Sequence, residues 1–324
     1  MAIARKRIID ESEVGTYLVT NRCVRRAFLM GEDFCTGEML DFRRGWIVEW
    51  LESLSKVMLI DVLDFCVMSN HYHLVLRNRP DLLNELSDEE CARRLALMYP
   101  GVSCVERLPD EACPLRIKEM LEGNNFEKKK QRLASISHFM AIWQEAVAKR
   151  ANVEDDCTGH FWEGRFHSVK LLDSIAVLYA IAYVDLNPIK AKLTSDICKS
   201  KYTGLKLRLD SRNESGGARD TWLASFDSRK HPDGCLPMTL DSYVNLIQFR
   251  ADAWLAHKLS TVLDHNPKGL HELGVSKELW ATPIDSVIGS FKYMMGCEES
   301  LNQQAVADGK QWYAGISTAR VLTA

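Results

Sequence analysis

The feature that most constrains this chain is a segment in which two short apolar runs meet at a tight turn. It covers residues 64–78, reads DFCVMSNHYHLVLRN, and turns at residues 68–70. This pattern predicts two antiparallel strands, the second of which begins with His71, Tyr72 and His73. Side chains alternate along a strand, so both imidazoles project from one face while Tyr72 points to the other. Two such imidazoles can hold one metal ion, although a strand with two partly exposed histidines accounts for the same sequence.

The residues around this hairpin predict an α+β fold. Residues 15–21 alternate in a β-rich pattern, and residues 34–56 carry apolar side chains at helical spacing. With strands at 57–67 and 71–76, the order is strand, helix, strand, strand, which is the first half of a ferredoxin-like arrangement. A helix over residues 135–150 and a strand before residue 173 complete this layout.

Composition limits the class of protein. The chain has 324 residues, of which 46% are hydrophobic and 26% charged, as in an ordinary soluble globular protein. Because it lacks a long apolar run and a secretion signal, we expect a cytoplasmic protein with no membrane partner. Its ten cysteines form no C-x-x-C pair, so neither a zinc ribbon nor a disulfide framework is predicted. A net charge of −3 means that any nucleic-acid binding must come from local basic patches.

The segment that follows residue 173 carries a tyrosine and an asparagine on one face of a predicted helix. Asp173 or Ser174 is a plausible N-cap for a helix in which Tyr183 and Asn187 are four residues apart. Pro188 is a helix breaker and should place Asn187 at or near the helix end. The residues alone leave two readings open. Either Tyr183 packs in the core and Asn187 caps the helix, or Tyr183 faces the two histidines.

Four motifs in order resemble those of a known family. They read YLVTNR, FCVMSNHYHLVL, GHFWEGRFHS and AYVDLNPIKAKL, and all lie within residues 1–200. This array is similar to that of the single-tyrosine HUH transposases, most closely the REP-associated, insertion-sequence-200-like group. The chain departs from the usual family pattern at three positions. Ser69 replaces a proline, Tyr72 replaces an aliphatic residue, and Lys190 stands where arginine is frequent.

The resemblance implies a ferredoxin-like HUH endonuclease domain that cleaves single-stranded or hairpin DNA. His71 and His73 match the metal-binding histidines, Asn187 matches the polar residue that completes the metal site, and Tyr183 matches the nucleophile. Nitrogen and oxygen ligands favour Mg²⁺ or Mn²⁺ as the divalent cofactor. Attack by the tyrosine would give a 5′-phosphotyrosine and a free 3′-OH, so strands could be rejoined without ATP. The lack of a phosphate-binding G-x-x-x-x-G-K-[ST] loop agrees with this.

Basic and aromatic residues near these motifs are candidates for contacts with DNA. Arginines and a lysine would bind phosphates, and aromatic or guanidinium groups would stack on or clamp unpaired bases. A solvated charged face and a core aromatic cluster are the alternatives. The candidates are Arg22, Arg25, Arg26, Trp162, Arg165 and Lys170, together with Phe161 and the basic cluster at 128–132.

The sequence predicts three parts: a catalytic domain at 1–200 with an acidic helical insertion at about 81–127, a linker at 201–220, and a helical accessory domain at 221–324. The accessory domain, with helices expected at 241–259 and 277–295, could hold a DNA hairpin or mediate self-association as a homodimer. Three functions remain open. They are a DNA strand transferase, a domesticated hairpin-binding protein without turnover, and a phosphoesterase in which water attacks and Tyr183 is structural.

Overall fold

A five-stranded sheet organises the chain in the computed structural model, which describes residues 7–32, 37–101, 107–215, 221–255, 270, 274–275, 280 and 282–322. The strand order is β2-β3-β1-β4-β5. The first four strands pair antiparallel, and β5 pairs parallel with β4. The strands are β1 (Gly15–Arg22), β2 (Ile60–Val67), β3 (His71–Asn78), β4 (His167–Leu171) and β5 (Met294–Met295).

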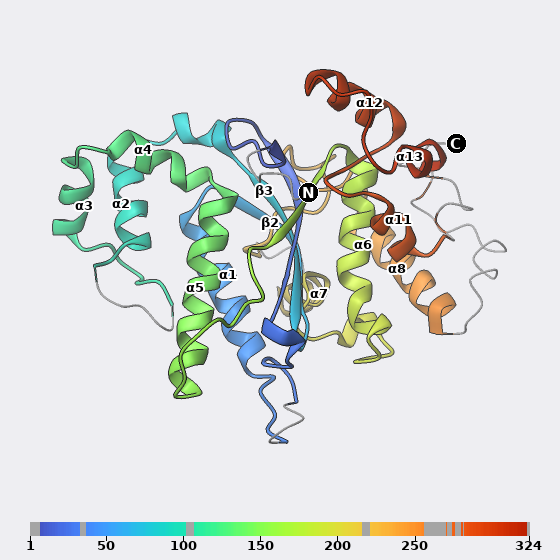
Figure 1. Ribbon diagram of the computed structural model, residues 1–324, viewed down its shortest axis with the longest axis horizontal. Coiled ribbons are helices and arrows are strands. Elements are labelled where there is room, and N and C mark those ends of the chain that lie inside the picture. The colour runs from blue at the N-terminus through green and yellow to red at the C-terminus, as the bar shows by residue number, and fades with distance from the viewer. Residues whose placement is uncertain are drawn as a thin grey trace.

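Helices cover both faces of the sheet, and Figure 1 shows α1 and α5 on one side of the strands and α6 on the other. The helices α1 (Arg43–Val57) and α5 (Ile136–Glu154) follow β1 and β3 in the chain, which gives the order β1-α1-β2-β3-α5-β4. This order and the antiparallel core confirm the predicted α+β, ferredoxin-like class. Helix α6 (Ser174–Lys190) is added on the opposite face.

Alternation along the strands divides the core in two. Tyr17 and Tyr72 pack on the face covered by α1 and α5, whereas Leu18 and Val75 pack on the α6 face. The two aromatic side chains are completely buried. The predicted hairpin is thereby confirmed, with strands that begin and end within three residues of the expected bounds.

Helix α6 begins where the sequence predicts and ends later. The Asp173 side chain accepts a hydrogen bond from the Ala176 amide at 2.9 Å, as expected of an N-cap. Pro188 does not stop the helix, which continues to Lys190. The last turn remains closed because the Leu193 amide donates to the Pro188 carbonyl at 2.9 Å. Asn187 therefore lies inside the last turn of the helix.

The acidic segment forms a separate helical layer beyond α5 (Figure 1). Within the described residues its elements are short, and Ser87 caps the first α-helix by accepting from the Glu90 amide. They and the elements up to α5 are η3 (Pro80–Asn84), α2 (Asp88–Met98), α3 (Pro114–Leu121), α4 (Phe126–Lys130) and η4 (Gln131–Ala134).

The region after β4 and α6 is mainly helical and contacts the sheet directly. Residues 204–215 of the expected linker form a helix, and residues 216–220 lie outside the described part of the chain. Of the helix expected at 277–295, residues 284–290 form a helix and residues 294–295 form strand β5, while residues 277–279 and 281 lie outside the described part of the chain. The division into domains stays a prediction. The remaining elements are η5 (Ile197–Lys199), α7 (Gly204–Ser215), α8 (Leu240–Leu255), α11 (Ile284–Ser290), α12 (Glu298–Ala307) and α13 (Ile316–Leu322).

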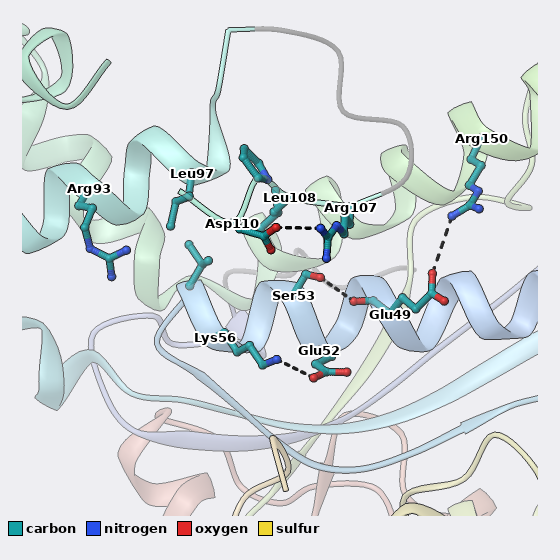
Figure 2. A pocket seen from close by; sticks show the side chains of 12 residues that line it. Glu49, Glu52, Ser53, Lys56, Arg93, Leu97, Arg107, Leu108, Asp110 and Arg150 are labelled. Atoms are coloured by element: carbon teal, nitrogen blue, oxygen red, sulfur yellow. Dashed lines mark hydrogen bonds and ion pairs between the residues drawn. The ribbon is translucent and has the colours of Figure 1, made fainter. Parts of the chain in front are cut away.

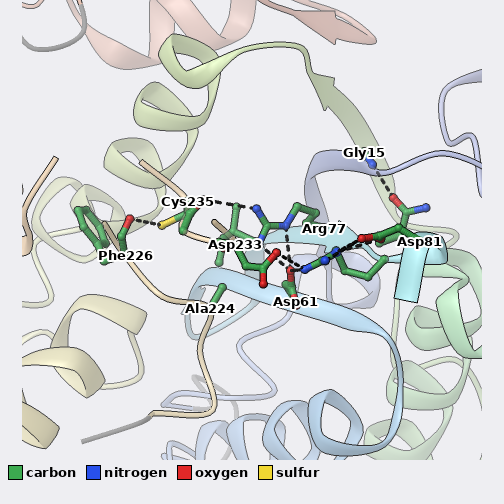
Figure 3. Close-up of polar contacts among 12 residues, drawn as sticks. Gly15, Asp61, Arg77, Asp81, Ala224, Phe226, Asp233 and Cys235 are labelled. Carbon is green, nitrogen blue, oxygen red and sulfur yellow. Dashed lines mark hydrogen bonds and ion pairs between the residues drawn. The ribbon is translucent and has the colours of Figure 1, made fainter. Parts of the chain in front are cut away.

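A charged network fastens this C-terminal region to strands β2 and β3 (Figure 3). Arg77 pairs with Asp61 at 2.7 Å and donates to the Asp233 carbonyl, while Arg79 binds the Asp233 carboxylate at 2.7 Å. Nearby, the Ala224 amide donates to the Val62 carbonyl at 3.0 Å. The outer edge of β2 is therefore covered by chain from the C-terminal region rather than left open.

Candidate active site

The two histidines of β3 lie side by side on the face covered by α6. In the antiparallel register with β1, His71 is opposite Arg22 and His73 is opposite Thr20. Their ring centroids are 4.9 Å apart with the planes at 90°. His73 is only 6% exposed, and His71 is partly buried. The strand alternation inferred from sequence therefore places both imidazoles on the same face, as expected.

Asn70 determines which ring nitrogen of His71 carries the proton. Its side-chain oxygen lies 2.7 Å from His71 Nδ1, and its amide nitrogen donates to the Arg26 carbonyl at 3.1 Å. Because an amide oxygen can only accept, Nδ1 carries the proton and Nε2 keeps its lone pair. Burial, together with the positive charges of Arg22 and Lys190, lowers the pKa of His71 to about 4. His71 is thus neutral at physiological pH and free to act as a ligand through Nε2.

His73 has a buried ring for which the described part of the chain offers no hydrogen-bond partner. Both ring nitrogens are shielded from solvent and unpaired. Burial, reinforced by His71, lowers its pKa well below the usual value, so the ring is neutral. A buried ring nitrogen without a partner destabilises the fold unless another group binds it. A divalent metal ion can do so, because it accepts the lone pair of an imidazole nitrogen. This orphaned side chain fits a metal site.

Helix α6 brings Tyr183 against the histidines. The Tyr183 ring centroid lies 5.0 Å from that of His73, with the planes at 88°. Burial, reinforced by the negative charge of Asp285, raises the pKa of the Tyr183 phenol. One turn further on, Asn187 is 8% exposed and donates through Nδ2 to the Tyr183 carbonyl at 2.7 Å, which leaves its amide oxygen as the atom that can bind a metal.

The donor set is small. Among the described residues no group of three or more His, Cys, Asp and Glu side chains is placed to hold a metal ion. A site at His71 and His73 would therefore need an oxygen ligand of another type, and the amide oxygen of Asn187 is of that chemical type. Two imidazoles and one amide oxygen leave coordination positions for a substrate oxygen and water.

A pocket of about 620 Å³ opens over His71, His73 and Tyr183, and Asn187 is not among its lining residues. Its walls come from β1, β3, β4, the loop before β4, α6 and the segment around α11. The loop is tied to β1 because Asn21 Nδ2 donates to the Gly164 carbonyl at 2.8 Å and the Glu163 amide donates to the Arg22 carbonyl at 2.9 Å. The residues that line the pocket include Arg22, His71, His73, Arg165, Tyr183 and Gly289.

Four of the six residues predicted to contact DNA lie near this pocket. Arg22 and Arg165 line it, and both are exposed. Arg25 and Arg26 are also exposed, in the short helix η2 (Val24–Arg26), with left-handed φ angles of 55° and 56°. Asn70 links this turn to His71 through the Arg26 carbonyl. The basic turn and the histidines are thus adjacent.

The other two residues predicted to contact DNA, Trp162 and Lys170, lie away from the pocket. Trp162 is 8% exposed, donates from Nε1 to the Gln144 carbonyl at 2.9 Å, and packs its ring against Tyr72. Base stacking does not fit this position, because the ring fills the core on the α1 and α5 face; the adjacent Phe161 is buried as well. Lys170 is in register with Tyr17, so it projects from that same face, away from the pocket.

Some residues of the pocket have no signal in the sequence. Ile288, Gly289 and Phe291 line the pocket and come from a segment about 100 residues after Tyr183 that carries no recognisable motif. Asp285, which contacts Lys190, belongs to the same segment. His167, by contrast, lies in the motif GHFWEGRFHS, lines the pocket from β4 and is exposed. Only the β4 pairing, which places His167 opposite Thr20, brings it to this face.

A second pocket, of about 560 Å³, lies along the outer side of α1 (Figure 2). Its charged side chains neutralise one another, as in the Lys56–Glu52 pair at 2.6 Å and the Arg107–Asp110 pair at 2.8 Å. Arg93 is paired with Glu90 at 2.7 Å. The pocket holds none of the motif residues, so it does not compete with the histidine and tyrosine site.

None of the helices in the described residues combines the length and apolar character that crossing a membrane requires. A scan against protein-family models gave no match, and a search of the curated proteins gave none either. Among solved structures, the chain is similar to one described as the REP-associated tyrosine transposase bound to a REP hairpin, with a TM-score of 0.35 and 13% identity. The likeness covers 72% of this chain and 97% of that one. No site residue is assigned from it.

Proposed function

We propose that this protein is a metal-dependent single-stranded DNA endonuclease and strand transferase in which Tyr183 is the nucleophile. The observation that carries the proposal is the pairing of Tyr183 with His73. A buried imidazole, for which no described residue is a hydrogen-bond partner, lies against the tyrosine ring at 5.0 Å between centroids. A purely structural histidine would be expected to have a partner in the core, whereas a metal ligand keeps its nitrogen free until the metal binds.

The chemistry follows from the residue types. His71, His73 and Asn187 would hold a divalent ion, Mg²⁺ or Mn²⁺, which when bound polarises the scissile phosphate and offsets the charge on the leaving oxygen. The Tyr183 oxygen attacks phosphorus, the bond from phosphorus to the 3′ oxygen breaks, and a 5′-phosphotyrosine forms. The phenolic proton leaves to solvent and the 3′ oxygen takes up a proton. The phosphotyrosine conserves the phosphodiester bond energy for rejoining.

Local positive charge supports DNA as the substrate. Arg22, Arg25, Arg26 and Arg165 are exposed around the pocket although the whole chain has a net charge of −3. They would bind the phosphates of an unpaired strand near Tyr183. Hairpin recognition is the expectation from the four-motif array, and a hairpin is also the ligand named for the solved structure above.

A gel assay tests this function. The protein is incubated with Mn²⁺ or Mg²⁺ and labelled single-stranded hairpin oligonucleotides from repeats near its own gene, then run on a denaturing gel. Wild type should give a metal-dependent protein–DNA band that Tyr183→Phe and His71→Ala abolish. Tyr179→Phe is the matched control, because Tyr179 lies one turn earlier on α6, buried against Trp280, and its hydroxyl has no hydrogen-bond partner among the described residues. It should keep the band.

Other outcomes would replace the proposal. Cleavage without a covalent band, unaffected by Tyr183→Phe, would mean that water attacks and that the protein is a phosphoesterase. Binding of the hairpin with neither cleavage nor adduct in either metal would mean a binding protein without turnover.

A further inference from the structure

A charged pair links the C-terminal region to the helix that carries Tyr183. Lys190, in the last turn of α6, lies 2.6 Å from Asp285 in the first turn of α11. The same Lys190 ammonium is centred over the Tyr183 ring, 4.2 Å from its centroid. The lysine side chain is only 12% exposed, so this contact is largely shielded from water. Tyr183 is therefore in contact with Lys190 of the same motif, and Lys190 is paired with Asp285, which lies outside that motif.

Two contacts of different geometry fix the Tyr183 ring. His73 approaches it edge-on, with an interplanar angle of 88°, and Lys190 lies over its face. A cation over an aromatic face is attracted to the ring, more strongly when water is excluded. Together they restrict rotation of the side chain, and the ammonium adds positive charge beside the place where a phosphate must approach.

Asp285 determines where Lys190 points. A lysine side chain is long and flexible, and without a partner its ammonium would favour solvent. The Asp285 carboxylate holds it back over the ring. Helix α11 is also a wall of the pocket, because Ile288 and Gly289 line it next to Tyr183. The C-terminal region thus contributes to the site at two points.

We propose that Lys190 is a positioning residue for Tyr183 and that Asp285 holds Lys190 in place, so that α11 of the C-terminal region completes the active site. This inference rests on the proposed function, since it concerns the same nucleophile. Lys190 takes no part in bond making or breaking. It holds the phenol in the geometry needed for attack and favours the approach of the phosphate.

The test is a double-mutant cycle on formation of the protein–DNA adduct. Single turnovers with the hairpin oligonucleotide are timed for wild type, Lys190→Met, Lys190→Arg, Asp285→Asn and the double variant Lys190→Met/Asp285→Asn. Lys190→Met should slow the adduct by about 100-fold, the cost of misplacing a reacting group by about 1 Å. Asp285→Asn should slow adduct formation by about tenfold. The double variant should be no slower than Lys190→Met alone, because the two substitutions remove the same contact.

Three readouts separate positioning from a merely structural role. Lys190→Arg should restore most of the rate, because a guanidinium can also stack on the ring. Hairpin affinity and Mn²⁺ affinity, measured without turnover by titration, should stay within about threefold of wild type in every variant, a difference of less than one kcal/mol. The matched control is Lys192→Met, an exposed lysine two residues further on, which should leave the rate unchanged.

The outcomes are distinct. If wild type forms the adduct and Lys190→Met forms it equally fast, the inference is overturned while the proposed function stands. Fully additive effects of Lys190→Met and Asp285→Asn would overturn the role of Asp285. If wild type gives no adduct at all, the proposed function fails, and this inference fails with it.

Discussion

The two faces of strand β3 differ in what their side chains require. On one face Tyr72 is completely buried, packs edge-on against Trp143 at 4.6 Å between centroids, and receives a hydrogen bond from Gln144 at 2.6 Å. On the other face His73 is 6% exposed, and no described residue is a hydrogen-bond partner of either ring nitrogen. Within the described part of the chain, the Tyr72 hydroxyl has a hydrogen-bond partner and the His73 ring does not.

This contrast shows how one strand can serve stability and chemistry together. Because successive side chains alternate, the position of Tyr72 in the aromatic core fixes the backbone on which His71 and His73 stand. The core on the α1 and α5 face supplies the rigid support, so the α6 face can keep groups that weaken the fold. Substitutions on the two faces should therefore have different effects on stability.

The largest expected effect is on stability at the satisfied face. Tyr72→Ala should lower the free energy of unfolding by about 3–5 kcal/mol, because it leaves a large cavity beside Trp143. Tyr72→Phe should cost only about 1 kcal/mol, since it keeps the aromatic ring and removes the hydrogen bond with Gln144. Urea unfolding measures both. Equal costs for the two variants would show that Tyr72 does not support the hairpin by packing.

A smaller change in the free energy of unfolding, of opposite sign, is expected on the face that carries His73. Without metal, His73→Leu should be neutral or stabilising, because it replaces an unpaired buried imidazole with an apolar side chain. In Mn²⁺ at 100 times its dissociation constant, wild type should gain about 2.7 kcal/mol over the chelated protein, and the variant should gain nothing. Unfolding curves in Mn²⁺ and in EDTA give both values. A His73→Leu protein that Mn²⁺ still stabilises to the same extent would contradict the assignment of His73 as a ligand.

The last effect concerns pH and the buried carboxyl groups of Asp64 and Asp185. They are adjacent on the α6 face, and Tyr243 donates to Asp185 at 2.6 Å. Burial raises the pKa of Asp185 to about 7 and that of Asp64 well above its usual value. The unfolded chain releases these protons near pH 4, before the folded chain does. Stability from this pair is therefore lost as pH rises from about 4 to about 7, by at most about 1.4 kcal/mol per pH unit for each proton.

Asp64→Asn removes one carboxyl group and allows the other to accept a hydrogen bond from an amide. The variant should therefore lose less stability than wild type over this pH range. Thermal unfolding from pH 4 to pH 8 measures the difference between the two proteins, in which the other titrating groups cancel. Parallel curves would show that the pair does not hold an extra proton in the fold.

Local sequence patterns were enough for the elements that depend on local physics. The period of two in residues 64–78 and the turn between them predicted the hairpin and the shared face of His71 and His73. The helical spacing after Asp173 predicted that Tyr183 and Asn187 share a face, and the strand and helix order predicted the α+β class. These features arise from side-chain alternation, capping and turn chemistry, all of which act over a few residues.

Tertiary structure alone decided which distant segments meet. Trp162 belongs to an aromatic and basic stretch, yet it is buried because the middle of α5 and strand β3 offer it a core site. Asp285 lies about 100 residues from Tyr183, and nothing in its surroundings marks it as a partner of Lys190. Such contacts depend on the packing of α11 against α6 and on the pairing of β5 with β4, and these long-range arrangements leave no period in the sequence. The sequence by itself determined the histidines, the tyrosine and the strand and helix that carry them, and only the folded chain decided what surrounds them.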